Sequence, residues 1–595
     1  MRRLNFYSLV GLFLLILVIV ITSYAIIANW RQHPGIILIL LVVVLALAVG
    51  IGTLVRTILE IIKINRNLPK EEPTLIKSTS QSISTSLTQT GIQDTIAKTL
   101  RTEKIAGTTI ENQTIQNLLD SIPSPLFSIP NPPADFIGRE VELNEFLRAV
   151  ESRGLIIAGE SGSGGVGKTA LAYQFAQSIA SYYPDGQIYL DLRGAREQRP
   201  LLPSEAMSSV VHAYQPDIKL PENEMELQAL YRSVLQNQHA LLLLDNAGDF
   251  QQVEPLMPPD SCLLLVTSSG QFRLPGMKTY QLEALPEEYA EKLLRKIVPR
   301  AGEYARRLAG LCGRLPLALR VAARSLRESP SLSLPDYLAR LDELMQRLEL
   351  TGVEASLQLS YELLEENLQG YFRLLAVFPG SFDKAAAASV WELEGSSAAD
   401  ILGELLRFNL IEYNSLTRRF KLHDLARLFA GRMMEAEERE AAKKLHAGHY
   451  LKILDTADQF YRGGGEAYKA GLALFDLEWG NIQAGHAWSV EKAAQDESAS
   501  HWCVDYPTAG SNIINIRLQP AQMIAWLEAA VESARRAGDR RSEGNWLSSL
   551  GNACREMGQV EQASVYLKQA LEIFEEIKSP DAHKVREWLS EIDSN

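Results

Sequence analysis

The sequence predicts a multidomain protein with two membrane-spanning helices at its N-terminus, a parallel α/β domain in the middle and a long α-helical part behind it. Three observations predict this fold class. Two long apolar runs contain no charged side chain, short apolar runs then alternate with helical patterns, and after about residue 285 the pattern is almost wholly helical. Alternation of strands and helices is typical of a parallel sheet with crossover helices. The expected strands lie at 155–158, 187–192, 240–244 and 262–267.

The two uncharged runs, at about 4–30 and 35–55, are each long enough to cross a bilayer as a helix. Lys and Arg residues flank the pair on both sides, whereas the short loop between the runs contains only Arg31 and His33. The positive-inside rule therefore places both flanks in the cytoplasm. We predict a transmembrane hairpin over residues 1–66, a multi-pass location in the inner or plasma membrane, and cytoplasmic soluble domains. A cleaved signal peptide is the alternative for the first run.

Composition separates a linker from the globular part of the chain. Residues 67–132 are rich in Ser, Thr, Gln and Pro, which predicts a flexible linker. The chain of 595 residues has a net charge of −13, although its first seventy residues are basic. An acidic soluble part argues against binding of nucleic acid, because the phosphate backbone repels negative charge. The cysteines are far apart and predict buried or free thiols, namely Cys262, Cys312, Cys503 and Cys554.

A glycine-rich segment at 155–169 carries the clearest chemical signal. It reads LIIAGESGSGGVGKT, which is an apolar strand, a turn and the start of a helix. Residues 162–169 match G-x-x-x-x-G-K-[ST], the phosphate-binding P-loop. Glycines let backbone N–H groups close around phosphates, and the helix N-terminus attracts the same anion. We therefore predict that a domain at 133–285 binds a nucleotide with Mg²⁺, through Gly162, Gly164, Gly165, Val166, Gly167, Lys168, Thr169 and Ala170.

Lys168 and Asp245 are the candidates for catalysis in this domain. Lys168 would reach the β and γ phosphates, and Thr169 would ligate Mg²⁺. The apolar strand at 240–244 ends in Asp245, which would support the same cation. Many hydrolytic NTPases follow this aspartate with a second acid that activates water, but the next residue here is Asn246, which cannot act as a base. We predict slow hydrolysis if no other residue takes that role.

The last part of the chain, 436–595, has a repetitive helical pattern. Trp526-Leu-Glu-Ala-Ala-Val is echoed by Tyr566-Leu-Lys-Gln-Ala-Leu, and large residues alternate with small ones between them. Such alternation on paired helices predicts tetratricopeptide-like repeats, with an ordinary amphipathic helical bundle as the alternative. His446 and His449 have the spacing of a two-ligand metal site. Because no third ligand is near them in the sequence, we interpret them as exposed helical histidines.

Taken in order, the motifs resemble those of NB-ARC proteins of the STAND class of signalling ATPases, in the bacterial form that carries tetratricopeptide-like repeats. The resemblance covers roughly residues 133–595. It implies a helical domain at 286–350 and a winged helix at 351–435, whose wing is a β-hairpin at 410–422. The motifs are FIGRE at 136–140, GGVGKT at 164–169, LDNA at 244–247, VTS at 266–268, GRLPLAL at 313–319 and LHD at 422–424.

The resemblance also implies roles for single residues. Arg139 would lie near the nucleotide and Pro316 would pack on the adenine. The family usually has an arginine after the Thr-Ser that ends the fourth strand, where it senses the γ-phosphate. This chain has Ser269 there, so either Arg273 substitutes for it or sensing is weakened.

One further motif residue would act as a lock. His423 lies between a wing strand and the next helix, and Asp424 is positioned to cap that helix. The resemblance implies that His423 contacts the β-phosphate of ADP and holds the inactive state.

These roles combine into an expected function. The resemblance implies a switch in which ADP holds the domains closed and ATP opens them, and the predicted hairpin would anchor it to the membrane. An unknown protein or small ligand on the C-terminal repeats would bias the exchange, and opening would expose a surface for homo-oligomerisation. Hydrolysis would be slow, as in a switch rather than a metabolic enzyme. The alternative is an anchored tetratricopeptide scaffold with a structural nucleotide. A winged helix resembles DNA-binding folds, but fold does not imply function and no nucleic acid is expected as a partner.

Overall fold

The computed structural model describes residues 124–593, except for 150–153, 160–163, 195–198 and 222. The two predicted membrane segments, at 4–30 and 35–55, lie outside the described residues, as does most of the predicted linker. The end of that linker pairs with the first domain, because Ser128 N donates a hydrogen bond of 3.0 Å to Gln187 O.

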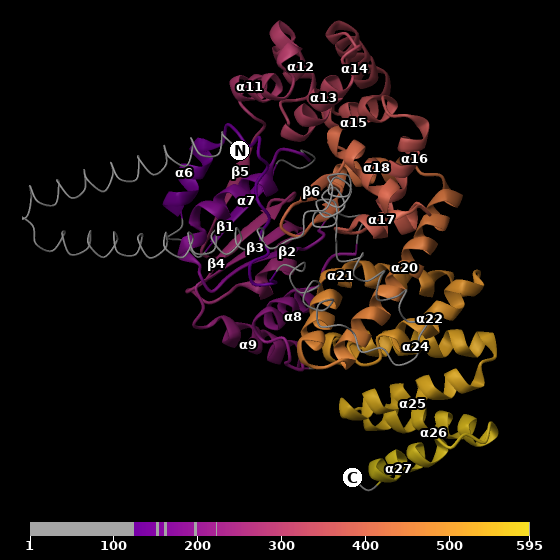
Figure 1. The fold of residues 1–595 in the computed structure, drawn as a ribbon. Helices are drawn as coiled ribbons and strands as arrows, with labels where there is room; N and C mark the ends of the chain where they lie inside the picture. The colour runs from indigo at the N-terminus through magenta and orange to yellow at the C-terminus, as the bar shows by residue number, and fades with distance from the viewer. Residues whose placement is uncertain (1–123, 150–153, 160–163, 195–198, 222, 594–595) are drawn as a thin grey trace, which may run out of the picture. The chain divides into compact units, whose positions relative to one another are not determined.

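A five-stranded parallel sheet forms the centre of the first domain (Figure 1). Its strand order is β2-β3-β4-β1-β5, and all four strand pairs are parallel. Four of the strands match the apolar runs that predicted them. The fifth, β5, was not predicted because it is an edge strand in which half of the side chains are exposed. The strands are β1 Gly154–Gly159, β2 Gly186–Asp191, β3 Ala240–Ala247, β4 Leu263–Ser268 and β5 Met277–Leu282.

Helices cover both faces of this sheet because the strands are apolar on both sides. One set of alternate side chains, including Ile157 and Leu243, packs against α6 (Glu140–Ala149) and α7 (Lys168–Ile179). The other set, including Ile156 and Leu242, packs against α8 (Pro203–Tyr214) and α9 (Glu224–Leu235). Burial on both faces is characteristic of parallel sheets. The polar carboxyl ends of the strands are therefore left free to form a site.

The middle of the chain is helical, with one β-hairpin at the predicted place. The antiparallel strands β6 (Glu412–Asn414) and β7 (Arg419–Lys421) form the hairpin, and Phe420 of β7 also bridges to Phe382. The short α10 (Phe250–Val253) belongs to the first domain. The remaining helices are α11 Glu287–Ile297, α12 Ala305–Leu311, α13 Pro316–Glu328, α14 Leu334–Leu348, α15 Gly352–Glu362, α16 Glu366–Leu374, α17 Lys384–Val390, α18 Gly395–Arg407 and α19 Asp424–Met433.

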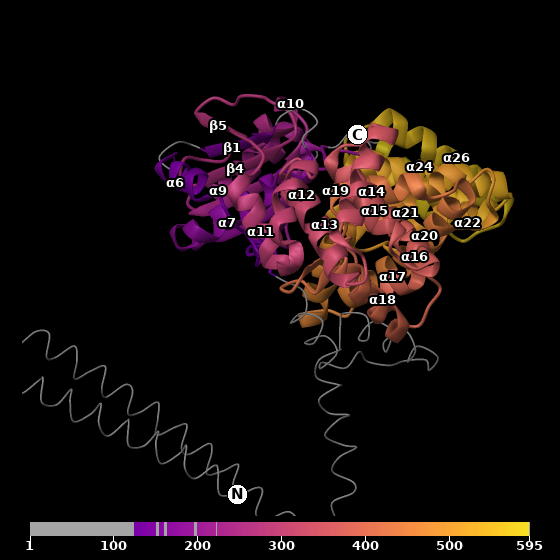
Figure 2. The same cartoon turned by 90° about the horizontal axis from the view of Figure 1, so that it is seen from above.

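The C-terminal part consists of paired helices (Figures 1 and 2). In the pair α25–α26, a Cβ on Gly551 would lie 2.6 Å from Cγ of Leu567, and one on Gly544 would lie 2.7 Å from Phe574. Small residues on one helix thus admit large residues of the next, which explains the alternation in the sequence. The helices are α20 Ala436–Arg462, α21 Gly465–Lys492, α22 Glu497–Ala509, α23 Ile514–Arg517, α24 Pro520–Ala537, α25 Arg540–Glu556, α26 Val560–Glu576 and α27 Ala582–Asp593.

The membrane part of the predicted fold class is corrected by the structure. Among the described residues, no helix is both long enough and apolar enough to cross a membrane. The longest ones, α20 and α21 with 27 and 28 residues, carry charged side chains along their length and pack against each other. A charged side chain at the centre of a bilayer is costly. The predicted transmembrane hairpin, the membrane partner and the multi-pass membrane location are therefore withdrawn.

The interpretation of His446 and His449 as exposed helical histidines is also wrong. His446 is buried, with Nε2 at 3.4 Å from Oδ1 of Asn481, and Nε2 of His449 is enclosed by protein. Within the described part of the chain, no three His, Cys, Asp or Glu side chains gather as a metal site. The helix α20 turns these histidines inward because they follow its apolar face. All four cysteines are buried free thiols.

Burial of these histidines predicts acid sensitivity. Burial lowers the pKa of His446 to about 3 and that of His449 to about 4, against 6.5 in an unfolded chain. The unfolded state therefore binds more protons below pH 6.5, and stability is lost as the pH falls from there toward the folded pKa. At pH 5, His446 alone should cost about 2 kcal/mol. His446→Gln should lose less thermal stability than wild type between pH 7 and 5. The exposed His583→Gln should behave as wild type.

Candidate functional site

The P-loop joins β1 to α7, as the motif predicted. Gly165 and Gly167 have φ values of 80° and 97°, which residues other than glycine rarely adopt. The helix α7 starts at Lys168. A Cβ on Gly164 would lie 2.6 Å from Cδ1 of Leu425, so this glycine is needed for the close approach of α19. Gly162 lies outside the described residues.

Asp245 lies near the end of β3, where it meets the first turn of α7. Thr169 Oγ1 donates a 2.8 Å hydrogen bond to Asp245 Oδ1, and Thr267 Oγ1 donates to the same oxygen. Tyr189 OH donates to Oδ2 over 3.1 Å. The sequence predicted Thr169 and Asp245 as the metal pair, and the structure brings them together. A hydroxyl and a carboxylate beside a phosphate loop are the oxygen ligands that Mg²⁺ prefers, so these residues fit that cation.

Burial disfavours the charged forms of Asp245 and Lys168. Burial raises the pKa of Asp245, and the nearby Asp191 raises it further. Burial lowers the pKa of Lys168, against the opposing effect of Asp245. A cation between Asp245 and a phosphate would relieve the first effect, and an anion beside Lys168 would relieve the second. The site is therefore suited to a phosphate group together with a metal ion.

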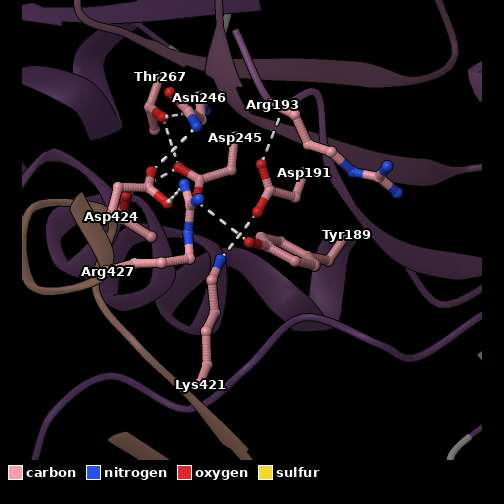
Figure 3. Close-up of polar contacts among 10 residues, drawn as sticks. Tyr189, Asp191, Arg193, Asp245, Asn246, Thr267, Lys421, Asp424 and Arg427 are labelled. Carbon is pink, nitrogen blue, oxygen red and sulfur yellow. Dashed lines mark hydrogen bonds and ion pairs between the residues drawn. The ribbon is translucent and has the colours of Figure 1, made fainter. Parts of the chain in front are cut away.

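A second carboxylate, which the sequence did not single out, stands at the end of the neighbouring strand. Asp191 closes β2 and is aligned with Asp245 in the parallel pairing. Its Oδ2 accepts a 2.8 Å hydrogen bond from Nζ of Lys421, and its Oδ1 accepts one of 3.0 Å from the backbone N of Arg193 (Figure 3). Burial would raise the pKa of Asp191, but Lys421 lowers it overall. Burial would lower the pKa of Lys421, but Asp191, Asp424 and Asp245 hold it well above its usual range.

Asn246 connects the strand β3 to the motif at 422–424. Its backbone has a φ of 58° at an irregularity of β3, and its backbone N donates to Thr267 Oγ1 over 3.0 Å. Its Nδ2 donates a 3.0 Å hydrogen bond to Oδ2 of Asp424, whose Oδ1 lies 3.5 Å from Arg427 Nη2 (Figure 3). The residue that cannot act as a base thus holds a contact to α19.

The structure assigns the helix cap to His423 rather than to Asp424. Nδ1 of His423 accepts a 3.2 Å hydrogen bond from the backbone N of Leu425, so this histidine is the N-cap of α19. Asp424 is the first residue of the helix and is engaged by Asn246 instead. His423 is thereby held two residues before Leu425, which touches the P-loop glycine.

A pocket with a largely apolar lining lies beside the P-loop. Arg139 is buried there, and its Nη2 donates to Val166 O over 3.2 Å and to Glu283 O over 2.7 Å. Pro316 begins α13 and packs on Gly167. Arg320, one turn later on α13, was missed in the sequence because it belongs to no motif, and Asp135 holds it through a 2.9 Å ion pair. The lining residues are Phe136, Ile137, Arg139, Val166, Gly167, Ala170, Leu285, Leu293, Pro316 and Arg320.

The structure does not bring Arg273 to this site. Ser269 and Arg273 are both exposed in the loop that follows β4. Thr267, at the end of the same strand, is the residue that reaches Asp245. The polar end of β4 therefore supports the aspartate, while the position of the family's arginine faces solvent.

Comparison with known proteins supports the resemblance. A family model described as "Tetratricopeptide repeat" matches residues 514–576, which span α23 to α26. "Regulatory protein AfsR" from Streptomyces coelicolor is 31% identical over 488 residues, covering 75% of this chain and 49% of the relative. "Disease resistance RPP8-like protein 3" from Arabidopsis thaliana is 26% identical over 337 residues, covering 49% and 37%. The chain thus spans at most about half the length of these relatives.

A solved structure is also similar. It is a Signal Transduction ATPase with Numerous Domains (STAND) protein with a tetratricopeptide repeat sensor, from Pyrococcus horikoshii. It is 16% identical, with 79% of this chain and 81% of that chain covered and a TM-score of 0.41.

The parallel sheet, the glycine-rich loop and the buried Asp245 define a P-loop nucleotide-binding fold. The order of its motifs and its relatives show more. Its similarity to AfsR over 75% of the chain, its similarity to a plant disease resistance protein and its tetratricopeptide repeat match support the resemblance to NB-ARC proteins of the STAND class.

Proposed function

We propose that this protein is a nucleotide-controlled signalling switch that binds ADP or ATP between its P-loop domain and its winged helix. The contact of the winged helix with the nucleotide site carries the proposal. Leu425 packs on the P-loop glycine Gly164, Asp424 accepts a hydrogen bond from Asn246, and Lys421 pairs with an aspartate of β2. None of these contacts survives if the winged helix moves away. The occupancy of the site and the arrangement of the domains are therefore coupled.

The proposed binding residues divide the nucleotide between two regions. The phosphates lie on the P-loop with Lys168, and Mg²⁺, which neutralises their charge, is held by Thr169 and Asp245. The adenine lies in the pocket against Pro316, with Arg139 nearby. The remaining contacts come from the backbone N–H groups of Gly162, Gly164, Gly165, Val166, Gly167 and Ala170.

We further propose four structural units: the P-loop domain at 133–285, the helical domain at 286–350, the winged helix at 351–435 and the repeats at 436–595. The repeats form direct hydrogen bonds with the P-loop domain. Gln483 and Gln522 donate hydrogen bonds of 3.1 and 2.6 Å to Oε1 of Glu205 on α8. A protein or small ligand that binds the repeats and disturbs these bonds would shift the switch. Its opening would expose surface for assembly with further copies.

The experiment that tests the switch compares sizes. The nucleotide retained on purification should be ADP, and the mass measured by light scattering after gel filtration should be that of a monomer. Exchange for a non-hydrolysable ATP analogue should give an expanded or oligomeric species. A protein that keeps its nucleotide but has the same size with both would instead be a scaffold with a structural nucleotide.

A prediction for His423 separates its two roles. A hydrogen bond from this imidazole to the β-phosphate of ADP is worth roughly 1.5–3 kcal/mol, so its loss should speed ADP release by about 10- to 100-fold. Because His423 also caps α19, His423→Ala removes both functions. His423→Asn retains an acceptor for the cap and should release ADP as fast as His423→Ala. Wild-type release from His423→Asn would show that the histidine is only a cap.

A further inference from the structure

The site has no acid at the usual place for activating water. The residue after Asp245 is Asn246, and its side chain is committed to Asp424. Lys421 forms an ion pair of 2.8 Å with Asp191, and the carboxylates of Asp424 and Asp245 also act on the charge of its ammonium. Asp245 belongs to the proposed cation site, and Asp424 is part of the winged helix, where Arg427 also holds it. Asp191 also belongs to the sheet, but unlike Asp245 it has no assigned role in binding the cation.

The position of Asp191 suits a base. It ends β2 directly opposite Asp245 of β3, and neighbouring strands lie about 4.8 Å apart. Side chains two residues apart on a strand share a face. Tyr189, two residues before Asp191, reaches Asp245 Oδ2 with its hydroxyl at 3.1 Å. Asp191 therefore shares with Asp245 both the face of the sheet and the carboxyl edge, where the P-loop begins after β1.

In the arrangement seen here, this carboxylate is engaged on both sides. Oδ1 accepts from the backbone of Arg193, which stays with the sheet, and Oδ2 accepts from Lys421, which comes from β7 of the wing (Figure 3). The ammonium of Lys421 occupies one lone pair of Oδ2 and stabilises the charged form of Asp191, so the carboxylate accepts a proton from water less readily while the ion pair is present. The wing thus blocks one carboxylate oxygen at the end of β2.

We propose that Asp191 is the general base for ATP hydrolysis and that Lys421 masks it until the winged helix leaves. This inference rests on the proposed function and adds the residue that performs the chemistry. With Lys421 withdrawn, Oδ2 of Asp191 accepts a proton from a water molecule. The water oxygen forms a bond to the γ-phosphorus, the bond from that phosphorus to the β–γ bridging oxygen breaks, and its electron pair leaves with ADP. Closed protein then keeps its nucleotide, and only open protein turns over ATP.

Two variants break the same ion pair with different consequences for the base. Lys421→Met leaves the carboxylate of Asp191 in place, whereas Asp191→Asn removes it and keeps its size. Release of a fluorescent ADP analogue reports the latch, and single-turnover hydrolysis of pre-bound ATP reports the base. Both variants should release ADP faster by a similar factor. Hydrolysis should rise at least tenfold in Lys421→Met and fall on the order of 100-fold in Asp191→Asn, within the usual range for loss of a general base.

The double variant and a matched control complete the test. Lys421→Met combined with Asp191→Asn should hydrolyse ATP as slowly as Asp191→Asn alone. Lys444→Met breaks another lysine–aspartate pair, with Asp496 at 2.6 Å on the C-terminal helices, and should change neither rate.

Two outcomes would overturn the assignment. Equal changes of hydrolysis in Lys421→Met and Asp191→Asn would mean that the pair is a latch without a base. Hydrolysis in Lys421→Met no faster than in wild type, with ATP bound, would mean that the ammonium masks nothing. Either result leaves the proposed switch standing if wild type still changes size between ADP and ATP. The absence of that change rejects the switch itself.

Discussion

Replacing Lys168 by alanine should abolish the retention of ADP on the purified protein. Lys168 is the cation of the P-loop motif, and burial already lowers the pKa of its ammonium. A phosphate beside it would form charge-assisted hydrogen bonds worth about 1.5–3 kcal/mol, so affinity should fall by roughly 10- to 100-fold or more. The measurements are the nucleotide content of purified protein and titration with a fluorescent ADP analogue.

The control for Lys168→Ala is Lys292→Ala, a change of an exposed lysine on α11 near the same pocket. It should retain wild-type nucleotide content. Circular dichroism should show an intact sheet in both variants. The side chain of Lys168 belongs to neither of the hydrophobic cores that cover the two faces of the sheet. Nucleotide that co-purifies with Lys168→Ala at wild-type stoichiometry would refute the proposed phosphate site.

Replacing Arg419 by methionine should destabilise the protein by about 3–5 kcal/mol. Arg419 of β7 forms a two-pronged ion pair with Glu478 of α21, with N–O distances of 2.6 and 2.7 Å. Both side chains are almost fully buried, at 1% and 4% exposure. Removing the arginine leaves a buried carboxylate without its cation, with only the amide of Asn481 donating to it, which costs far more than the pair contributes. Thermal and urea unfolding of the purified protein measure this loss.

Two further variants test the reason for the Arg419 effect. Arg419→Met combined with Glu478→Leu removes both charges and should recover most of the lost stability. Arg586→Met breaks an exposed pair with Glu575 and should cost about 0–1 kcal/mol. If Arg419→Met is no worse than Arg586→Met, the buried charge is solvated in the native protein and the argument fails.

The local elements of this protein can be read from the sequence, because each depends on residues close together in the chain. Four apolar runs became the buried strands of the sheet, and G-x-x-x-x-G-K-[ST] became the turn between β1 and α7. The alternation of large and small residues became paired helices, and a Tetratricopeptide repeat model matches them. The strand β5 was not predicted, because its exposed side chains give no continuous apolar pattern.

The sequence also identified several site residues without their partners. It predicted that Thr169 and Asp245 bind one cation, because a P-loop needs a carboxylate at the end of a neighbouring strand to support the metal. In the structure the two side chains share a hydrogen bond. It predicted Pro316 and Arg139 near the nucleotide through the family resemblance, and both line one pocket. It interpreted His446 and His449 as exposed, because spacing alone does not show which face of a helix is buried.

Sequence alone thus determined the class of protein and the phosphate loop, which follow from local spacing and composition. Only the tertiary structure decided which residues of β7 and α19 contact the carboxyl ends of the strands. Asn246 and Asp424 are 178 positions apart, and Asp191 and Lys421 are 230 apart. Neither pair belongs to a common motif, and each carboxylate could have paired with many cations or donors along the chain. The choice of partner depends on how separate elements pack, because hydrogen bonds require contact within about 3 Å.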